Sequence, residues 1–300
     1  MIAAGSRSQS VADAFSKEFG IPHSHGSYGS LVNDDEVDII YVASPHGLHH
    51  EHVMICLQHK RAVLCEKAFA INSKQANEMI ETARKENVFL MEALWSKFTP
   101  QHQLVQKMIK NGELGEIQSV LVHFGFKPEA PFSNRLYEPA LGGGTVLDIG
   151  VYNVFMVLSV LGRPDIVEAS MKPASTGVDE QCAATFRYKD GKIAQLFSTF
   201  LSNLATEADI NGNKARIRLT PRFYNPTTSH IEFYPGRIDK QIIPHHSEPG
   251  FGYQFETRHV CECLRQGLTE SPVMTHADTL LIMETLDRIR ASAGIHYDAD

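Results

Sequence analysis

The sequence predicts an α/β protein in two parts, a doubly wound parallel sheet followed by an α+β domain with an open, mostly antiparallel sheet. Up to residue 95, apolar runs of strand length alternate with segments of helical period, which is typical of βα units. Beyond residue 95, long β-rich runs are joined by hairpin signals instead. The 300 residues are 43% hydrophobic and 21% charged, as in ordinary globular proteins of one or two domains. We therefore predict domains over residues 1–95 and 96–300.

The first domain begins inside a βα unit. Residues 2–4 resemble the end of a strand, and apolar residues recur with helical period over residues 10–19. Turn signals and a short acidic helix are expected between residues 26 and 35. The elements that follow alternate, with strands at 37–43, 61–65 and 88–92 and helices at 51–58 and 73–86. This alternation implies a parallel sheet with helices on its faces.

The second domain is predicted to carry an antiparallel sheet. After a helix at 101–111, strands are expected at 117–126, 178–188, 192–200 and 205–211, with the turn sequences Lys189-Asp190-Gly191 and Asn211-Gly212-Asn213 beside them. Helices at 253–266 and 276–290 would pack on one side of the sheet, and its open face suits a second copy of the chain in a homodimer. Residues 221–252, rich in Pro, Gly and His, are expected to form an extended, poorly defined connection.

Composition and charge favour a small-molecule partner. The 28 Lys and Arg residues against 35 Asp and Glu residues give a net charge of −7, which offers no broad attraction to nucleic acid or to anionic membranes. No apolar run approaches the roughly 20 residues that span a bilayer, and no signal-peptide pattern is present, so we predict a cytoplasmic protein. Five cysteines without a CxxC pair are expected to be reduced and mostly buried.

Glu66 and Lys67 are the first candidate site residues. They follow the apolar run of residues 62–65, so two opposite charges stand at the carboxyl end of a buried strand, where α/β proteins place their chemistry. Such a pair needs a salt bridge or a ligand to offset its partial desolvation, and we favour a ligand. A surface ion pair is the structural alternative.

Asp148 and Tyr152 form a second candidate pair. They are four positions apart on a predicted helix, so they share a face and can reach one substrate. The structural alternative is that Thr145 and Asp148 form a capping box while Tyr152 buries its ring.

Four histidines, His46, His49, His50 and His52, crowd one turn. Imidazoles three positions apart can share a metal ion. No carboxylate or thiol completes a ligand set, so we predict no metal site there.

Four stretches together resemble a known family. They are Ser-Pro-His-Gly-Leu-His at 44–49, Cys-Glu-Lys-Ala at 65–68, Met-Glu-Ala-Leu-Trp at 91–95 and Gly-Gly-Gly-Thr-Val-Leu-Asp-Ile-Gly-Val-Tyr at 142–152. Their order and spacing resemble the glucose-fructose oxidoreductase/inositol dehydrogenase-like family over nearly the whole chain, and within it the dihydrodiol dehydrogenase branch. The usual Glu-Lys-Pro is Glu-Lys-Ala here, which leaves both charged residues in place.

The resemblance implies a Rossmann-like first domain and an NADP-dependent oxidoreductase. The substrate would be a cyclic vicinal diol, namely the trans-dihydrodiol of an aromatic, or a sugar such as D-xylose. Lys67 would lie beside nicotinamide and substrate, Asp148 would orient the acceptor, and Tyr152 would transfer a proton, with the choice between Lys67 and Tyr152 as base left open. The implied cofactor-binding residues are Ser6, Arg7, Ser44, Pro45, His46, His49, Glu66, Lys67 and Trp95. Trp95, Phe124 and Phe126 are candidates for the pocket wall, and core packing is equally compatible with the two phenylalanines.

NADP is favoured over NAD by the segment Gly5-Ser6-Arg7-Ser8. NAD-specific proteins place an acid at this point, where it binds the ribose hydroxyl, whereas an Arg and small polar residues accommodate a 2′-phosphate. In the alternative interpretation Arg7 is a solvated residue at a helix start.

The front of the chain departs from the family. Relatives begin with a strand and a glycine-bearing turn, which supply the central strand and the helix N-terminus that receives the cofactor pyrophosphate, and no GxGxxG occurs in this sequence. We therefore expect a sheet that lacks its first strand and weak or absent dinucleotide binding. The alternative function is a non-catalytic, dimerising or binding fragment that has lost cofactor binding.

Overall fold

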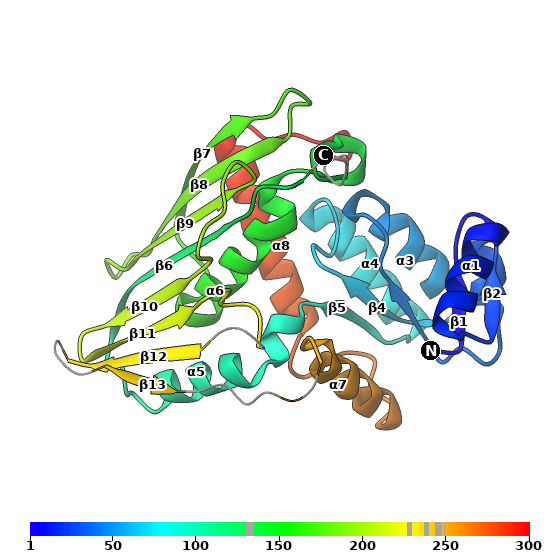
Figure 1. Ribbon diagram of the computed structural model, residues 1–300, viewed down its shortest axis with the longest axis horizontal. Helices are drawn as coiled ribbons and strands as arrows, with labels where there is room; N and C mark the ends of the chain where they lie inside the picture. The colour runs from blue at the N-terminus through cyan, green and yellow to red at the C-terminus, as the bar shows by residue number, and fades with distance from the viewer. Residues whose placement is uncertain (130–134, 227–229, 237–239, 244–247, 249) are drawn as a thin grey trace.

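The computed structural model describes residues 1–129, 135–226, 230–236, 240–243, 248 and 250–300. Figure 1 shows a large sheet on one side of the molecule and a group of parallel strands and helices on the other, with helix α8 between them. The predicted fold class is confirmed, because a parallel sheet with helices precedes a mostly antiparallel sheet.

The first part contains two small parallel sheets. Strands β1 (Ala3–Gly5) and β2 (His23–His25) pair with each other, and β3 (Ile39–Val42), β4 (Ala62–Glu66) and β5 (Leu90–Ala93) form the second sheet. The helices are α1 (Gln9–Phe19), α2 (Tyr28–Val32), α3 (His49–Gln58) and α4 (Ser73–Glu86). The sequence did not indicate β2, because its three residues, His-Ser-His, include no apolar side chain. The short helix expected between residues 26 and 35 is α2, but the expectation that it is acidic is wrong, because α2 contains no Asp or Glu.

A cavity of about 690 Å³ separates the two small sheets. It is lined by β1 on one side and by β3 on the other, and each of these strands pairs along one edge only among the described residues. The sheet therefore lacks a strand between β1 and β3, as the sequence predicted.

The second part is built on eight strands in the order β13-β12-β11-β10-β6-β9-β8-β7. Its strands are β6 (Ile117–Gly125), β7 (Ile166–Pro173), β8 (Asp179–Arg187), β9 (Ile193–Thr199), β10 (Ala208–Gly212), β11 (Ala215–Thr220), β12 (His230–Pro235) and β13 (Gln241–Ile243). All neighbours are antiparallel except β6 and β9, which run parallel. The four predicted strands are present with slightly different ends.

The expectation for residues 221–252 is wrong where the structure describes them. Strands β12 and β13 lie in this segment and extend the sheet beyond β11, so pairing with a preformed edge outweighs the weak local strand preference. Other residues of the segment lie outside the described part of the chain. Strand β7 was also missed, because it is an edge strand whose residues are all at least partly exposed.

Helices α6 (Val151–Leu161) and α8 (His276–Ala293) cover one face of the large sheet (Figure 1). The prediction that both C-terminal helices pack there is right for α8 and wrong for α7 (Tyr253–Arg265), which packs mainly against the short helix η2 (Trp95–Phe98) near helix α5 (Pro100–Lys110). A Thr275–Asp278 capping box begins α8.

The segment Pro139–Leu161 is long and apolar enough to cross a membrane, which corrects the expectation that no such run exists. Within the most apolar 18-residue stretch of this segment, 78% of the residues are buried inside the protein. The segment includes α6, so its apolar character is explained by its place in the core.

Candidate active site

Lys67 lies between the two parts of the molecule. It is the first residue after β4, and the turn η5 (Val146–Gly150) approaches it from the second part. The Lys67 ammonium donates a hydrogen bond to the backbone oxygen of Asp148 at 2.6 Å, and its Nζ lies 3.6 Å from Asp148 Oδ1. The side chains of Lys67 and Asp148 are 15% and 9% exposed, so this is a largely desolvated pair at the carboxyl end of a buried strand.

The Asp148 carboxylate faces three basic side chains. Both terminal nitrogens of Arg135 lie 3.4 Å from Oδ1, and His46 Nε2 lies 4.0 Å from it. Burial alone would raise the pKa of Asp148, but Lys67, His46 and Arg135 hold that pKa below its usual value. Asp148 is therefore an anion at neutral pH that can orient the Lys67 ammonium.

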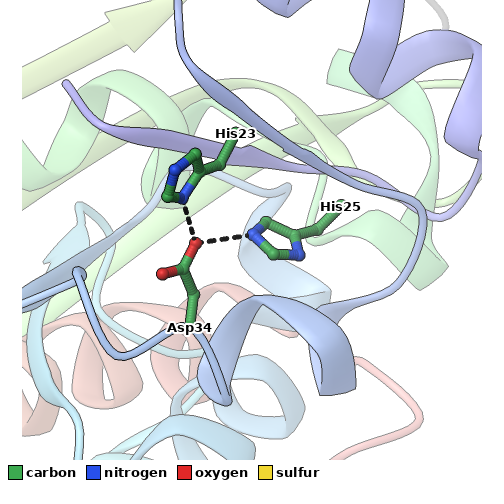
Figure 2. A group of neighbouring side chains, drawn as sticks. All are labelled: His23, His25 and Asp34. Carbon is green, nitrogen blue, oxygen red and sulfur yellow. Dashed lines mark hydrogen bonds and ion pairs between the residues drawn. The ribbon is translucent and has the colours of Figure 1, made fainter.

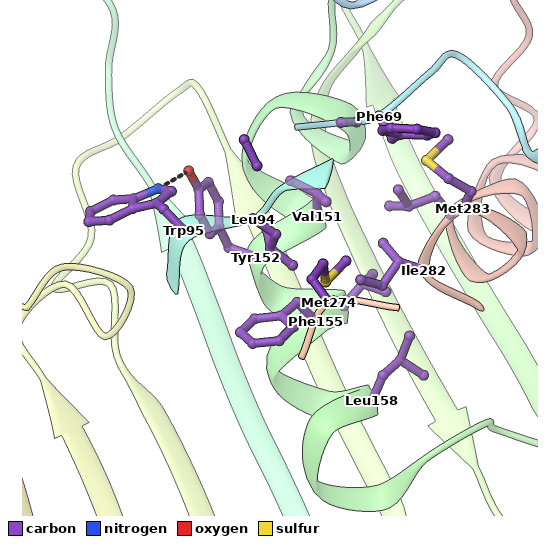
Figure 3. Close-up of a cluster of buried hydrophobic side chains, with 14 of the residues drawn as sticks. Phe69, Leu94, Trp95, Val151, Tyr152, Phe155, Leu158, Met274, Ile282 and Met283 are labelled. Atoms are coloured by element: carbon purple, nitrogen blue, oxygen red, sulfur yellow. Dashed lines mark hydrogen bonds between the residues drawn. The ribbon is translucent and has the colours of Figure 1, made fainter. Parts of the chain in front are cut away.

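Tyr152 stands on the other side of Lys67. Its ring centroid lies 5.0 Å from Nζ, and its hydroxyl oxygen accepts a hydrogen bond from Trp95 Nε1 at 2.9 Å (Figure 3). Burial raises the pKa of Tyr152 well above its usual value. Since the hydroxyl proton has no acceptor among the described residues, the neutral phenol can donate it to a bound ligand.

Trp95 is held in a cluster of aromatic rings. It stacks on Tyr253 with centroids 4.7 Å apart and meets Tyr224 edge-on. Gly252 lies against it with a positive φ of 112°, and a Cβ at that position would be 2.7 Å from Trp95 Cζ3. Phe124 stacks on Tyr224 at 4.6 Å, so this phenylalanine is a packing residue behind Tyr152.

The capping-box alternative for Asp148 is wrong. Thr145 does not cap the helix with its side chain; its hydroxyl donates to Asp179 Oδ2 at 2.5 Å. Gly144 permits this arrangement, because a Cβ there would be 2.3 Å from Asp179 Oδ1. Asp148 lies in a π-helical turn that precedes α6, and such turns are frequent at functional sites.

The loop after β3 brings Ser44, Pro45 and His46 to the site. Burial, and then the positive charge of Lys67, lower the pKa of His46 to about 3, so the ring is neutral, with Nδ1 3.1 Å from Gly142 O. His49 connects two loops, since its nitrogens lie 2.7 Å from Ser44 O and 2.9 Å from Ala68 O. Burial lowers the pKa of His49 to about 4, so the neutral ring donates to one of these oxygens at a time.

The four histidines of residues 46–52 face different partners. The hydrogen-bond partners of His46 and His49 are backbone oxygens. By contrast, His50 Nε2 lies 3.0 Å from a carboxylate oxygen of Glu78, and His52 Nδ1 lies 2.9 Å from the Ser44 hydroxyl oxygen. Their nitrogens therefore do not converge on one point.

Glu66 is engaged by the protein on both oxygens. The Tyr41 hydroxyl donates to Oε1, and the backbone N–H of Lys67 donates to Oε2 at 3.1 Å. Glu66 is therefore held in place at the end of β4.

Ser6 and Arg7 follow β1 at the rim of the 690 Å³ cavity. Ser6 lines the cavity and donates its backbone N–H to His25 O, while Arg7 is exposed and forms no hydrogen bond or ion pair within the described residues. Arg7 is thus free to meet an anionic ligand.

Arg135, Tyr224 and Tyr253 are site residues that sequence reasoning missed. Each comes from a short turn or a helix start far along the chain, and no periodic pattern marks them. A contact made only in three dimensions has no local signal to find.

Glu256 on α7 gives the protein a pH-dependent stability. Burial, with the charges of Glu66 and Glu92, raises the pKa of Glu256 from 4.5 to about 9. The proton bound by Glu256 stabilises the folded state fully below pH 4.5, and this stabilisation is lost as the pH rises to about 9. Between these two pH values, the free energy of unfolding falls by up to about 1.4 kcal/mol per pH unit. Glu256→Gln stays neutral, so it should melt at a higher temperature than the native chain near pH 9 and at a similar temperature near pH 5. If the melting temperatures of Glu256→Gln and the native chain differed by the same amount at about pH 5 and at about pH 9, the raised pKa of Glu256 would be contradicted.

Fold and site together define an oxidoreductase of the nicotinamide-binding class, and comparison with known proteins supports this. Residues 1–94 match the model of the oxidoreductase family with an NAD-binding Rossmann fold, and residues 102–218 match the GFO/IDH/MocA C-terminal domain. The chain belongs to the GFO/IDH/MocA family of oxidoreductases.

Its relatives include trans-1,2-dihydrobenzene-1,2-diol dehydrogenases. That of Xenopus tropicalis is 36% identical over 99% of this chain and 91% of its own, and that of Homo sapiens is 30% identical over 100% of this chain and 90% of its own. A 3-ketoreductase from Actinomadura kijaniata, solved with NADP, has a TM-score of 0.87 at 27% identity and covers 98% of this chain and 89% of its own.

The residues of the site fit the nicotinamide end of a dinucleotide cofactor. Lys67, Tyr152 and Trp95 gather where the reactive ring and the substrate would meet, and Arg7 stands free at the opposite side. Between them, where the diphosphate would lie on a glycine-rich turn, the described residues leave the cavity between β1 and β3.

Proposed function

We propose that this chain is an NADP-dependent dehydrogenase that oxidises a secondary alcohol. The substrate is either a cyclic vicinal diol, namely the trans-dihydrodiol of an aromatic, or a sugar such as D-xylose. The observation that carries the proposal is the Lys67 ammonium, which is held by Asp148 and lies 5.0 Å from the centre of the Tyr152 ring. The hydroxyl proton of Tyr152 has no acceptor among the described residues. The dihydrodiol dehydrogenases among the relatives support the diol.

Oxidation of the alcohol removes a hydride from carbon and a proton from oxygen. The nicotinamide, when bound, is the hydride acceptor. Lys67 donates a hydrogen bond to the reacting oxygen, and Tyr152 or Lys67, in its basic form, takes the proton. In the reverse direction, the neutral Tyr152 phenol donates its proton to the carbonyl oxygen. Because burial raises the pKa of Tyr152, the phenol carries its proton at neutral pH and is present as this donor.

The substrate class is tested by comparing two alcohols. The purified chain, and a form extended by a β-strand and a glycine-rich turn before residue 1, are each mixed with NADP and either a trans-dihydrodiol of benzene or D-xylose. Formation of reduced nicotinamide is followed by absorbance. We expect a higher kcat/KM for the dihydrodiol, because the aromatic rings near Tyr152 form an apolar wall. A higher kcat/KM for xylose would assign the sugar instead.

Arg7 is proposed to select NADP. Its exposed guanidinium follows β1 without a nearby acid in residues 5–8, so it can pair with a 2′-phosphate. Arg7→Ala should raise the Kd for NADPH by roughly tenfold or more and leave the Kd for NADH unchanged. Lys17→Ala on α1 is the exposed control. Equal weakening of both cofactors would contradict the selective role.

The alternative function is a non-catalytic fragment, and the cavity between β1 and β3 favours it specifically. Two parallel strands with free edges flank an unfilled space where the family places a central strand. An extended form, in which a β-strand and a glycine-rich turn precede residue 1, would fill this space. If only the extended form oxidised alcohols, this chain would be the fragment.

We also propose a cytoplasmic homodimer. The five cysteines are free, which suits a reducing compartment. The outer face of the large sheet carries the exposed residues Leu121 on β6, Ile193 on β9 and Ile166 on β7. These residues support a contact between copies. Sedimentation equilibrium should give twice the mass of the chain, and a mass equal to one chain would reject the dimer.

A further inference from the structure

A group of metal-ligand side chains lies outside the proposed active site, on the small sheet at the front of the chain. His23 and His25 alternate along β2, so both imidazoles point to the same side of the strand. Asp34 follows α2 and directs its carboxylate between them (Figure 2). The ligand atoms of the three residues all lie within 4.8 Å of one another.

One carboxylate oxygen is shared by the two rings. Asp34 Oδ2 lies 2.7 Å from His23 Nδ1 and 2.9 Å from His25 Nε2. Zinc holds nitrogen and oxygen ligands at about 2.1 Å, which places tetrahedral ligand atoms about 3.3 Å apart. Asp34 Oδ2 would therefore move only about half an ångström away from each imidazole nitrogen to admit an ion.

Within the described residues, no Lys or Arg pairs with Asp34, whose ion-pair partners are the imidazoles of His23 and His25. Its other oxygen accepts the backbone N–H of Glu36, and the nearby Arg61 pairs with Asp35 instead. The Asp34 side chain is 8% exposed, whereas His23 and His25 are 33% and 18% exposed. The group is thus a nearly buried carboxylate with two imidazoles and an opening to water, which leaves room for a fourth ligand.

Glu36, whose side chain is 67% exposed, lies near the second nitrogen of His23 without a hydrogen bond to it. Its Oε1 lies 3.8 Å from Nε2 of His23, the nitrogen that faces away from Asp34. A metal on Nδ1 requires the proton of a neutral His23 to sit on Nε2, and ligating histidines usually donate that N–H to a carboxylate or carbonyl.

We propose that His23, His25 and Asp34 bind one divalent transition-metal ion of the zinc class, with water as the fourth ligand. Two imidazoles and one carboxylate favour Zn²⁺, Co²⁺ or Ni²⁺ over Mg²⁺ or Ca²⁺, which prefer all-oxygen sites. The ion would connect β2 to the segment after α2. Because β1 and β2 are three-residue strands in a two-stranded sheet, this link would stabilise a unit that is marginal by itself.

The test is a titration of the metal-free 300-residue chain with Zn²⁺ by calorimetry and with Co²⁺ by visible absorption. We expect one Zn²⁺ per chain with a micromolar Kd, the absorption of four-coordinate Co²⁺, and a higher melting temperature with Zn²⁺. His25→Ala should weaken binding by about 100-fold or more, because the loss of a residue that only hydrogen-bonds a metal ligand already costs about 10- to 100-fold.

Two further variants keep the result interpretable. Asp34→Asn preserves the size of the side chain and can still hydrogen-bond the imidazoles, so it should fold and still lose the tight site. His50→Ala is the matched control, because His50 also lies 3.0 Å from a carboxylate, that of Glu78, but without a second imidazole. Equal Zn²⁺ affinity in the native chain, His25→Ala and Asp34→Asn, or a six-coordinate Co²⁺ spectrum, would overturn the proposal.

Discussion

Replacing Lys67 with methionine should lower kcat by a factor of about 100 or more, and it should also lower the melting temperature, because the buried Asp148 carboxylate loses a partner. The methionine keeps the length and the apolar stem of the side chain but removes the ammonium that lies 2.6 Å from the Asp148 backbone oxygen. The variant therefore loses the donor to the reacting oxygen and leaves Asp148 with Arg135 as its charged partner. Steady-state kinetics of the extended form at saturating cofactor and alcohol, with and without the substitution, measure the effect.

Two controls separate chemistry from binding in this experiment. Lys74→Met changes an exposed lysine at the start of α4 and should leave turnover intact. NADPH titration of Lys67→Met should give a Kd near that of the native chain, because the loss is expected in the chemical step. Native turnover in Lys67→Met would remove Lys67 from the mechanism.

Tyr152→Phe should lower kcat by a factor of about 100 in the direction of carbonyl reduction. The ring remains in the aromatic cluster, but the proton that the buried phenol can donate is gone. The change also leaves Trp95 Nε1 without its acceptor, which should cost about 1–3 kcal/mol of stability. Turnover and thermal melts are measured on the same preparation.

Trp95→Phe is the matched variant for this second prediction. It removes the donor to Tyr152 and keeps the Tyr152 hydroxyl itself. If Tyr152 transfers the proton and Trp95 positions it, Trp95→Phe should lose much less activity than Tyr152→Phe. Equal losses in the two variants would assign the effect to packing rather than to proton transfer.

Local patterns explain which parts of this fold could be predicted. The apolar run that ends at Glu66 and the cap at Thr275 act within a few residues, so β4 and the start of α8 could be located from the sequence. The juxtaposition of Lys67 with Asp148, 81 positions apart, came from resemblance to a family, and the structure supplies its geometry.

The features that could not be predicted depend on tertiary contacts. Strands β12 and β13 form in a Pro- and Gly-rich segment because β11 offers an edge to pair with. Arg135 becomes a site residue only because its turn folds back onto Asp148. The π-helical turn that presents Asp148 carries the same residue pattern as an ordinary helix start, so its geometry is invisible in the sequence.

The claim at the centre of this account is that the residues around Lys67 act on a bound nicotinamide cofactor. The most direct test is a fluorescence titration of NADPH and NADH with this chain and, in parallel, with the extended form. The account predicts micromolar binding of NADPH by the extended form, tighter than that of NADH. It also predicts much weaker binding by this chain, whose central cavity between β1 and β3 is unfilled. Absence of binding in both forms would contradict the assignment of the site to nicotinamide chemistry.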